Sequence, residues 1–161
     1  GLGISQKRIV VSTSGVPKMI KKIADQDVKF KLAVSLHSAI NEKRTSLMPF
    51  NNKMNLKELE KSLSYWYKKT KKIITYEYVV WKGINDTDDD ISALVEFCKK
   101  TPSKVNLIQY NSIDDPNFVQ APEHVLNKYI KTLELNNIKA TIRKSRGEDI
   151  DAACGQLANK S

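Results

Sequence analysis

The sequence predicts an α/β fold built on a mainly parallel sheet, because strand-like and helix-like segments alternate along the chain with short loops between them. Short runs of β-branched and aliphatic residues indicate buried strands, and apolar residues at three- and four-residue spacing indicate helices. About five strands are expected, which is too few for a closed eight-stranded barrel. A parallel sheet or a partial barrel is therefore predicted.

In the first half of the chain, a strand, a helix, a strand and two helices are expected in turn, over residues 9–11, 17–24, 32–36, 42–47 and 56–66. Pro17 suits the first turn of the first helix, which continues with apolar residues at helical spacing. The pair Met48-Pro49 stops the second helix. Asn55, with Glu58 three residues later, predicts a capping box at the start of the third.

In the second half, a strand, a helix, a strand, a helix and a strand are expected in turn, over residues 73–81, 91–98, 105–110, 122–133 and 139–143. Residues 83–86 (Gly-Ile-Asn-Asp) predict a turn after the first of these strands. Asn136-Asn137 closes the second helix. Cys98 falls on the apolar face of its helix and is predicted to be a core residue, whereas His124 is predicted to lie on the surface.

The size and composition are those of one soluble domain or of a large piece of one. The chain has 161 residues and a mass of 18.3 kDa, with 40% hydrophobic and 28% charged residues. The sequence has no apolar run of about 18 residues, so no membrane span is predicted, and the N-terminus lacks the layout of a signal peptide. Cys98 and Cys154 form neither a disulfide framework nor a CxxC metal motif. A cytoplasmic protein without metal ligands of its own is expected.

The net charge of +9 and the isoelectric point of about 9.5 favour an anionic partner, nucleic acid first. A second explanation remains open, because many of the lysines fall on the faces or ends of predicted helices. Lysines in such places often serve only to keep a surface soluble.

Polar residues follow the predicted strands at the points where the strands end. In parallel α/β sheets these carboxyl ends meet at one edge, where ligands bind. The residues concerned are Ser12, Thr13, Ser14, Ser35, His37, Tyr110, Asn111 and, after the last strand, Cys154. This arrangement predicts a binding site, although each serine could equally serve to cap the local backbone.

Cys154 lies between small residues near the C-terminus and is open to two interpretations. Free cysteine is among the most buried residue types, which favours a structural thiol. Arg143, Lys144 and Arg146 just upstream would favour a reactive thiolate, while the acidic residues around 148–151 would oppose it.

Short blocks along the chain decide between these interpretations through a resemblance. The blocks are 12–15 (STSG), 34–37 (VSLH), 48–49 (MP), 76–79 (YEYV), 83–86 (GIND), 105–108 (VNLI), 110–111 (YN) and 149–157 (DIDAACGQL). In order and spacing, from about Arg8 to the C-terminus, they resemble the dual-specificity RNA methyltransferases of the radical S-adenosylmethionine (SAM) superfamily, the RlmN/Cfr family.

The resemblance implies a transferase that methylates carbon 2 of adenosine in large-subunit ribosomal RNA and in transfer RNA. Cys154 would be the catalytic residue, methylated by one S-adenosylmethionine to S-methylcysteine. A second S-adenosylmethionine, bound at a [4Fe-4S] cluster, would yield the radical that takes hydrogen from this methyl group before the carbon adds to the adenine. The family's SAM contacts map onto Ser12, the Ser35-Leu36-His37 segment and Asn111.

The resemblance also implies an architecture and partners. Residues 1–161 would be the C-terminal portion of a radical SAM core domain, folded as part of a partial, TIM-like (β/α) barrel. Ribosomal and transfer RNA would be the partners, together with a flavodoxin-type reductant, and the protein would be a monomer. Glu77 matches a glutamate in the fifth barrel strand and is expected to point inward, in a role that the resemblance does not specify.

Three family features are missing from the chain. The cluster-binding CxxxCxxC motif, the Gly-Glu-Pro stretch that binds the methionyl end of SAM, and the second cysteine that resolves the RNA crosslink do not occur. The chain also starts at Gly1, so we expect a fragment that is inactive alone. Gln109 and Ser112 replace the prolines that usually flank Tyr110-Asn111, which would loosen that loop.

Three alternatives remain at this point. The first is methylation at carbon 8 of adenosine, as in the Cfr branch, since both branches share the matched blocks. The second is a non-enzymatic RNA-binding domain in which Cys154 is structural. The third is a thiol hydrolase that uses Cys154 and His37, for which the local sequence offers no oxyanion hole.

Overall fold

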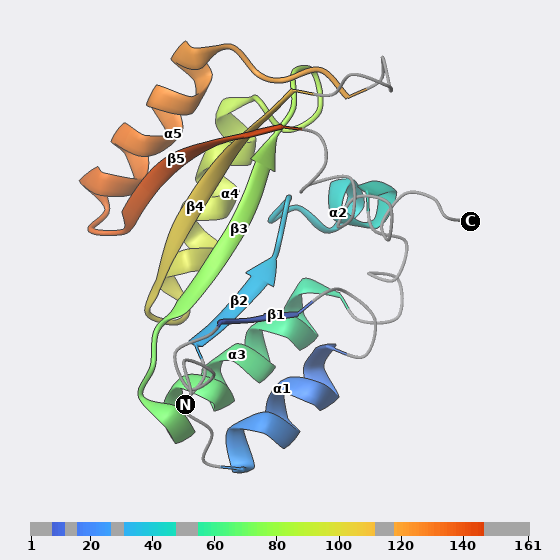
Figure 1. Cartoon of the computed structure of the whole chain (residues 1–161), viewed down its shortest axis with the longest axis vertical. Coiled ribbons are helices and arrows are strands. Elements are labelled where there is room, and N and C mark those ends of the chain that lie inside the picture. Colours follow the sequence, from blue (N-terminus) through green and yellow to red (C-terminus); the bar gives the residue numbers. More distant parts are fainter. Residues whose placement is uncertain (1–7, 12–15, 27–30, 48–54, 112–117, 147–161) are drawn as a thin grey trace.

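The sheet is the centre of the molecule. The computed structural model describes residues 8–11, 16–26, 31–47, 55–111 and 118–146. Its five strands form one sheet in the order β1-β2-β3-β4-β5, and each neighbouring pair is parallel (Figure 1). The predicted α/β class with parallel strands is confirmed.

Every predicted strand and helix within the described residues is present. The strands are β1 (Arg8–Val11), β2 (Lys31–Ser35), β3 (Ile74–Val80), β4 (Ser103–Asn111) and β5 (Lys139–Arg146). The helices are α1 (Val16–Asp25), α2 (Asn41–Leu47), α3 (Leu56–Thr70), α4 (Asp88–Lys99) and α5 (Glu123–Leu135). The predicted boundaries differ from these mainly at the element ends, where hydrogen bonding continues beyond the apolar pattern.

Four of the helices bury their apolar stripes against one face of the sheet. Side chains of α1, α3, α4 and α5 share one cluster with strand residues such as Val34 and Tyr76. Trp66 of α3, Leu94 of α4 and Leu133 of α5 are fully buried in it. Removal of this apolar surface from water is the main stabilisation of the fold.

A second, smaller apolar cluster lies near the carboxyl ends of β3 and β4. It consists of Val79, Trp81, Ile108 and Tyr110, with Phe118 packed against it. Successive side chains of a strand point to opposite faces, so these residues lie on the face opposite the four helices, called the helix-free face below. Leu47 at the end of α2 packs against the cluster on this face. One face of the sheet is therefore covered by four helices, and the other face carries the smaller cluster near the carboxyl ends of the strands.

Side-chain caps define the starts of two helices. Asn55 accepts a hydrogen bond of 3.1 Å from the backbone N–H of Glu58, so the predicted start of α3 is confirmed, but among the described contacts only this half of the predicted capping box is present. The full capping box, with both reciprocal bonds, is at the start of α4, between Thr87 and Asp90. The sequence pattern does not predict it, because Asp at the third position is less typical of a capping box than Glu or Gln.

Two single-residue predictions outside the strand ends are confirmed. Cys98 is 3% exposed, and burial raises the pKa of its thiol to about 12, so it is an inert core residue. His124 is exposed on the first turn of α5. None of the helices in the described ranges is long and apolar enough to cross a membrane.

Candidate functional site

The structure describes only part of the predicted site. The residues described with their side chains are Ser35, Leu36, His37 and Tyr110. Asn111 is the last residue of β4. Residues that lie outside the described ranges are Ser12, Thr13, Ser14 and Cys154. The geometry of the site is therefore built from the ends of β2, β3 and β4.

The segment Ser35-Leu36-His37, called the β2 strip below, ends β2 with its side chains on two faces. Leu36 is fully buried in the helix-side cluster. Its N–H donates to the carbonyl of Glu77 at 3.0 Å, which continues the β2–β3 ladder. Ser35 pairs in register with Glu77 on the other face, where it is 7% exposed. Any contact between Leu36 and a ligand on that face would come from its backbone.

His37 is held in an unusual conformation at the end of the β2 strip. Its backbone has φ 56°, in the left-handed region that few residues other than glycine adopt. The backbone N–H of Val79 donates to His37 Nδ1 at 3.0 Å, so the neutral ring carries its proton on Nε2. Burial, and then the positive charge of Arg44, lower the pKa of the imidazole from 6.5 to about 3. His37 is therefore a neutral donor at physiological pH.

An aromatic group borders His37 on the helix-free face. The Trp81 ring lies 5.8 Å from the His37 ring, 5.1 Å from Phe118 and 6.3 Å from Tyr110, measured between centroids. Trp81 is 1% exposed, and its indole Nε1 has no hydrogen-bond partner among the described residues. A buried donor without a partner is costly unless a ligand or water accepts from it.

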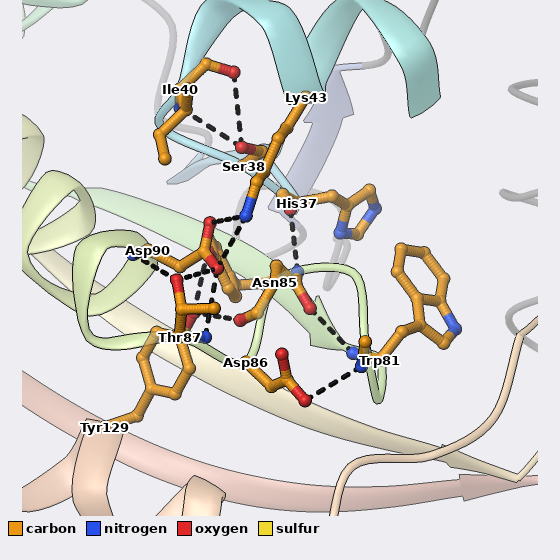
Figure 2. A network of polar contacts seen from close by, with 12 residues as sticks. His37, Ser38, Ile40, Lys43, Trp81, Asn85, Asp86, Thr87, Asp90 and Tyr129 are labelled. Atoms are coloured by element: carbon orange, nitrogen blue, oxygen red, sulfur yellow. Dashed lines mark hydrogen bonds and ion pairs between the residues drawn. The ribbon is translucent and has the colours of Figure 1, made fainter.

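The turn at residues 83–86 connects β3 to this site through Asn85 (Figure 2). Asn85 is fully buried, and its amide donates to the carbonyls of His37 and Val79 at 2.9 and 2.8 Å. Its Oδ1 accepts from the backbone N–H of Trp81 at 2.7 Å. Gly83, at φ 76°, allows the tight turn that brings Asn85 back beneath the strand end.

Helix α2 places a buried positive charge against the β2 strip. Arg44 is 3% exposed, and its guanidinium donates to the carbonyls of Leu36 at 3.2 Å and Ser35 at 3.3 Å. Burial lowers the pKa of Arg44 to about 10, which leaves it charged at neutral pH. A guanidinium suits this task because it presents several donors in one plane.

The neighbouring residue Lys43 ties α2 to α4. Its ammonium group lies 2.9 Å from both carboxylate oxygens of Asp90, whose side chain is fully buried (Figure 2). Asp90 Oδ2 also accepts from the N–H and hydroxyl of Thr87. The position of α2, and with it that of Arg44, is thus set by an ion pair between the partly exposed Lys43 and the buried Asp90.

Polar side chains continue across the helix-free face below the strand ends. The register aligns Ser35, Glu77, Asn106 and Thr141 on four neighbouring strands. Thr141 donates to Asn106 Oδ1 at 2.9 Å, and Glu77 is 7% exposed. The prediction that Glu77 points inward, away from solvent, is confirmed.

Comparison with known proteins identifies this arrangement. The chain is 66% identical over 160 residues, 99% of its length, to the protein named "Probable dual-specificity RNA methyltransferase RlmN" from Flavobacterium psychrophilum. It is 65% identical over 161 residues to the protein of that name from Christiangramia forsetii. This chain belongs to the RlmN family. The resemblance inferred from the sequence blocks is confirmed.

The RlmN-family chain spans 46% of the length of each of these two relatives. A radical SAM methyltransferase from Sphaerobacter thermophilus has the same fold, with a TM-score of 0.78 and 35% identity, over 93% of this chain and 44% of that one. A domain of a pyruvate-formate lyase-activating enzyme from Bacteroides vulgatus shares the fold alone, with a TM-score of 0.64 and 18% identity. No family model matches the chain. The predicted partial radical SAM barrel is consistent with these neighbours.

In this RlmN-family chain, the described residues offer hydrogen-bond donors rather than a set of metal ligands at the carboxyl ends of β2, β3 and β4. This edge of the sheet is called the rim below. Among the described residues, no group of three or more His, Cys, Asp or Glu side chains could hold a metal ion. His37 Nε2–H and Trp81 Nε1–H are donors at this edge of the sheet, on rings whose centroids lie 5.8 Å apart.

Sequence reasoning about this RlmN-family chain missed Trp81, Arg44 and Asn85 as site residues. Trp81 could have been found, because strand alternation places it on the same face as Glu77 and Val79. Asn85 was recognised only as part of a turn. Arg44 lies in a short polar helix, where a charged residue is expected to face solvent, and no local signal marks its burial.

Proposed function

We propose that this chain is part of a radical SAM RNA methyltransferase that methylates carbon 2 of adenosine in ribosomal and transfer RNA. The observation that carries the proposal is the neutral, buried His37 at the end of β2, beside the Trp81 indole, whose N–H has no partner among the described residues. The chain is also 66% identical to a protein named as a probable RlmN. Residues 1–161 would form the C-terminal portion of the radical SAM core domain of a longer protein.

The rim fits S-adenosylmethionine chemically. The ligand has acceptors on its adenine, ribose and carboxylate groups, and the His37 and Trp81 N–H groups are donors. The ligand also carries a positive sulfonium, which a neutral imidazole does not repel. Ser12, Ser35, His37 and Asn111 would hold it, with Leu36 fixing the strip between them. S-adenosylmethionine supplies the methyl group and, with a [4Fe-4S] cluster, the radical that such chemistry requires.

The cluster would be bound by another part of the longer protein. Two cysteines, Cys98 and Cys154, are too few for a [4Fe-4S] cluster, and Cys98 is buried in the helix-side core. A flavodoxin-type protein would supply the electrons, and the protein would be a cytoplasmic monomer. The net charge of +9 suits an RNA partner, because cationic groups replace the counterions of the phosphate backbone.

Cys154 would carry the methyl group as S-methylcysteine. A thioether carbon can be delivered to a ring carbon that is not nucleophilic, provided that the cysteine reaches both the SAM site and the base. Cys154 follows the last strand in sequence, and the carboxyl end of that strand belongs to the same edge of the sheet as His37.

The test is methylation of ribosomal and transfer RNA by the longest native protein that carries this chain, followed by mass mapping of the product. Carbon-2 methyladenosine is expected, and Cys154→Ser should abolish it. Cys98→Ser is the matched control and should retain activity, because Cys98 lies in the core. Carbon-8 methylation would overturn the regiochemistry, and methylation by Cys154→Ser would overturn the role of the cysteine. A protein that binds RNA without methylating it would be a binding module.

A further inference from the structure

We propose that Arg44 and Asn85 are positioning residues that together fix the β2 strip in the conformation that binds S-adenosylmethionine. The inference rests on the proposed function in one respect, namely that the β2 strip contacts this ligand. The residues themselves act through the strip, from its buried side. They form a clamp from two separate elements, α2 and the turn after β3.

The first step is the hydrogen bonding of the strip's backbone. Past the end of a β-strand, carbonyl groups lose their ladder partners and must find others. The guanidinium of Arg44 takes the carbonyls of Ser35 and Leu36, and the amide of Asn85 takes that of His37. The three consecutive carbonyls of the β2 strip are thus all bound by these two side chains, and the carbonyl of Leu36 also accepts from the backbone N–H of Ser38 at 2.7 Å.

The second step is the conformation that the clamp imposes. A left-handed backbone such as that of His37 costs roughly 1–2 kcal/mol for a residue with a Cβ. It persists only where the surroundings determine it, and such residues cluster at ligand sites. The bond from Asn85 to the His37 carbonyl and the bond from Val79 N–H to His37 Nδ1 oppose relaxation of the strip. Together they keep the proton of the neutral ring on Nε2.

The third step is that both clamp residues are themselves held firmly. The Oδ1 of Asn85 accepts from the backbone N–H of Trp81, and the backbone carbonyl of Asn85 accepts from the hydroxyl of Tyr129 on α5. Arg44 is kept in place because the adjacent Lys43 is paired with the buried Asp90 of α4. Helices on the far side of the sheet are therefore connected to the strip through side chains that no ligand would touch.

The test measures S-adenosylmethionine affinity and thermal stability in the native protein that carries this chain. Asn85→Asp keeps the Oδ1 acceptor and removes the donor, and Arg44→Lys keeps the charge and removes the planar fork. Each is expected to weaken ligand affinity by about tenfold or more. The matched control is Thr101→Val, which removes a partly buried hydrogen bond with Ser64 near the amino end of β4 and should leave affinity unchanged.

A readout on the unaltered protein covers the case in which a variant does not fold. In nuclear magnetic resonance spectra, the Arg44 Nε–H and Asn85 side-chain amide signals should shift on addition of S-adenosylmethionine, and the His37 nitrogens should show the Nε2–H form. Unchanged signals would overturn the proposal.

The outcomes distinguish failure of the clamp formed by Arg44 and Asn85 from failure of the proposed function. If Ser35→Ala and His37→Asn weaken affinity while Arg44→Lys and Asn85→Asp do not, the clamp is wrong and the proposed function stands. If Ser35→Ala and His37→Asn also leave affinity unchanged, the rim is not the ligand site, and both proposals fail. Loss of stability in the clamp variants with unaltered affinity would assign Arg44 and Asn85 a purely structural role.

Discussion

Acidification should destabilise this chain through His37, in a pH window that the structure defines. In the folded protein the His37 ring is neutral, because its Nδ1 accepts from the backbone N–H of Val79 and the ring is buried next to Arg44. Protonation would remove that acceptor and place a second positive charge beside the first. The unfolded chain has no such constraint, and its histidine takes up a proton near the ordinary pKa of 6.5.

The size of the effect follows from the two pKa values. Between pH 6.5 and about 3, the unfolded state binds a proton that the folded state does not, so stability rises with pH throughout this window. Each pH unit in it is worth about 1.4 kcal/mol. Acidification from about pH 7 to about pH 5 should therefore lower the free energy of unfolding by about 2 kcal/mol. That is a large fraction of the stability of a typical domain.

Urea unfolding at a series of pH values measures this slope, and the unaltered protein supplies the comparison for the variant. His37→Asn is the informative variant, since asparagine tolerates a left-handed backbone and can accept from Val79 through its amide oxygen. It should remove most of the slope between pH 5 and 7 (about 2 kcal/mol). A slope that persists in His37→Asn, or a His37 resonance that titrates near pH 6.5, would refute the reasoning.

Two further predictions concern neighbouring side chains. Lys43→Met should cost about 3 kcal/mol, since it leaves the fully buried Asp90 without its ion-pair partner, whereas Lys99→Met in the exposed pair with Glu96 should cost less than about 1 kcal/mol; equal losses in chemical denaturation would contradict this. Trp81→Phe keeps an aromatic ring and removes the unpartnered indole N–H, so it should weaken S-adenosylmethionine affinity about fivefold with little change in melting temperature. Titration calorimetry measures this change, and an unaltered dissociation constant would show that the indole does not meet the ligand.

Much of the fold could be predicted because it depends on local patterns. The alternation of short aliphatic runs with amphipathic segments is sufficient to place strands and helices. Side chains on one face recur about every 3.6 residues in a helix and every two residues in a strand, so the spacing of apolar residues distinguishes the two. The same logic placed Cys98 in the core and His124 on the surface. The alternation of strands and helices also predicts that the strands are parallel. The carboxyl ends of the strands therefore lie at the same edge of the sheet.

The candidate site could be predicted only in part. Ser35 and His37 were found because polar residues at the ends of parallel strands gather at one edge. Leu36 was placed with them by resemblance, although its side chain packs on the helix side. Predictions for Ser12, Asn111 and Cys154 remain predictions, since Ser12 and Cys154 lie outside the described residues and Asn111 is placed only as the end of β4.

The sequence by itself determined the α/β class, the order of the elements and the family, because periodicity and motif order are properties of neighbouring residues. Only the tertiary structure decided that His37 is neutral, that its Nδ1 is occupied and that Arg44 and Asn85 hold its strip. These properties depend on burial and on partners far apart in the chain. Asn85 reaches back to His37 across the β3 turn, and no local pattern records which carbonyl a buried amide will bind.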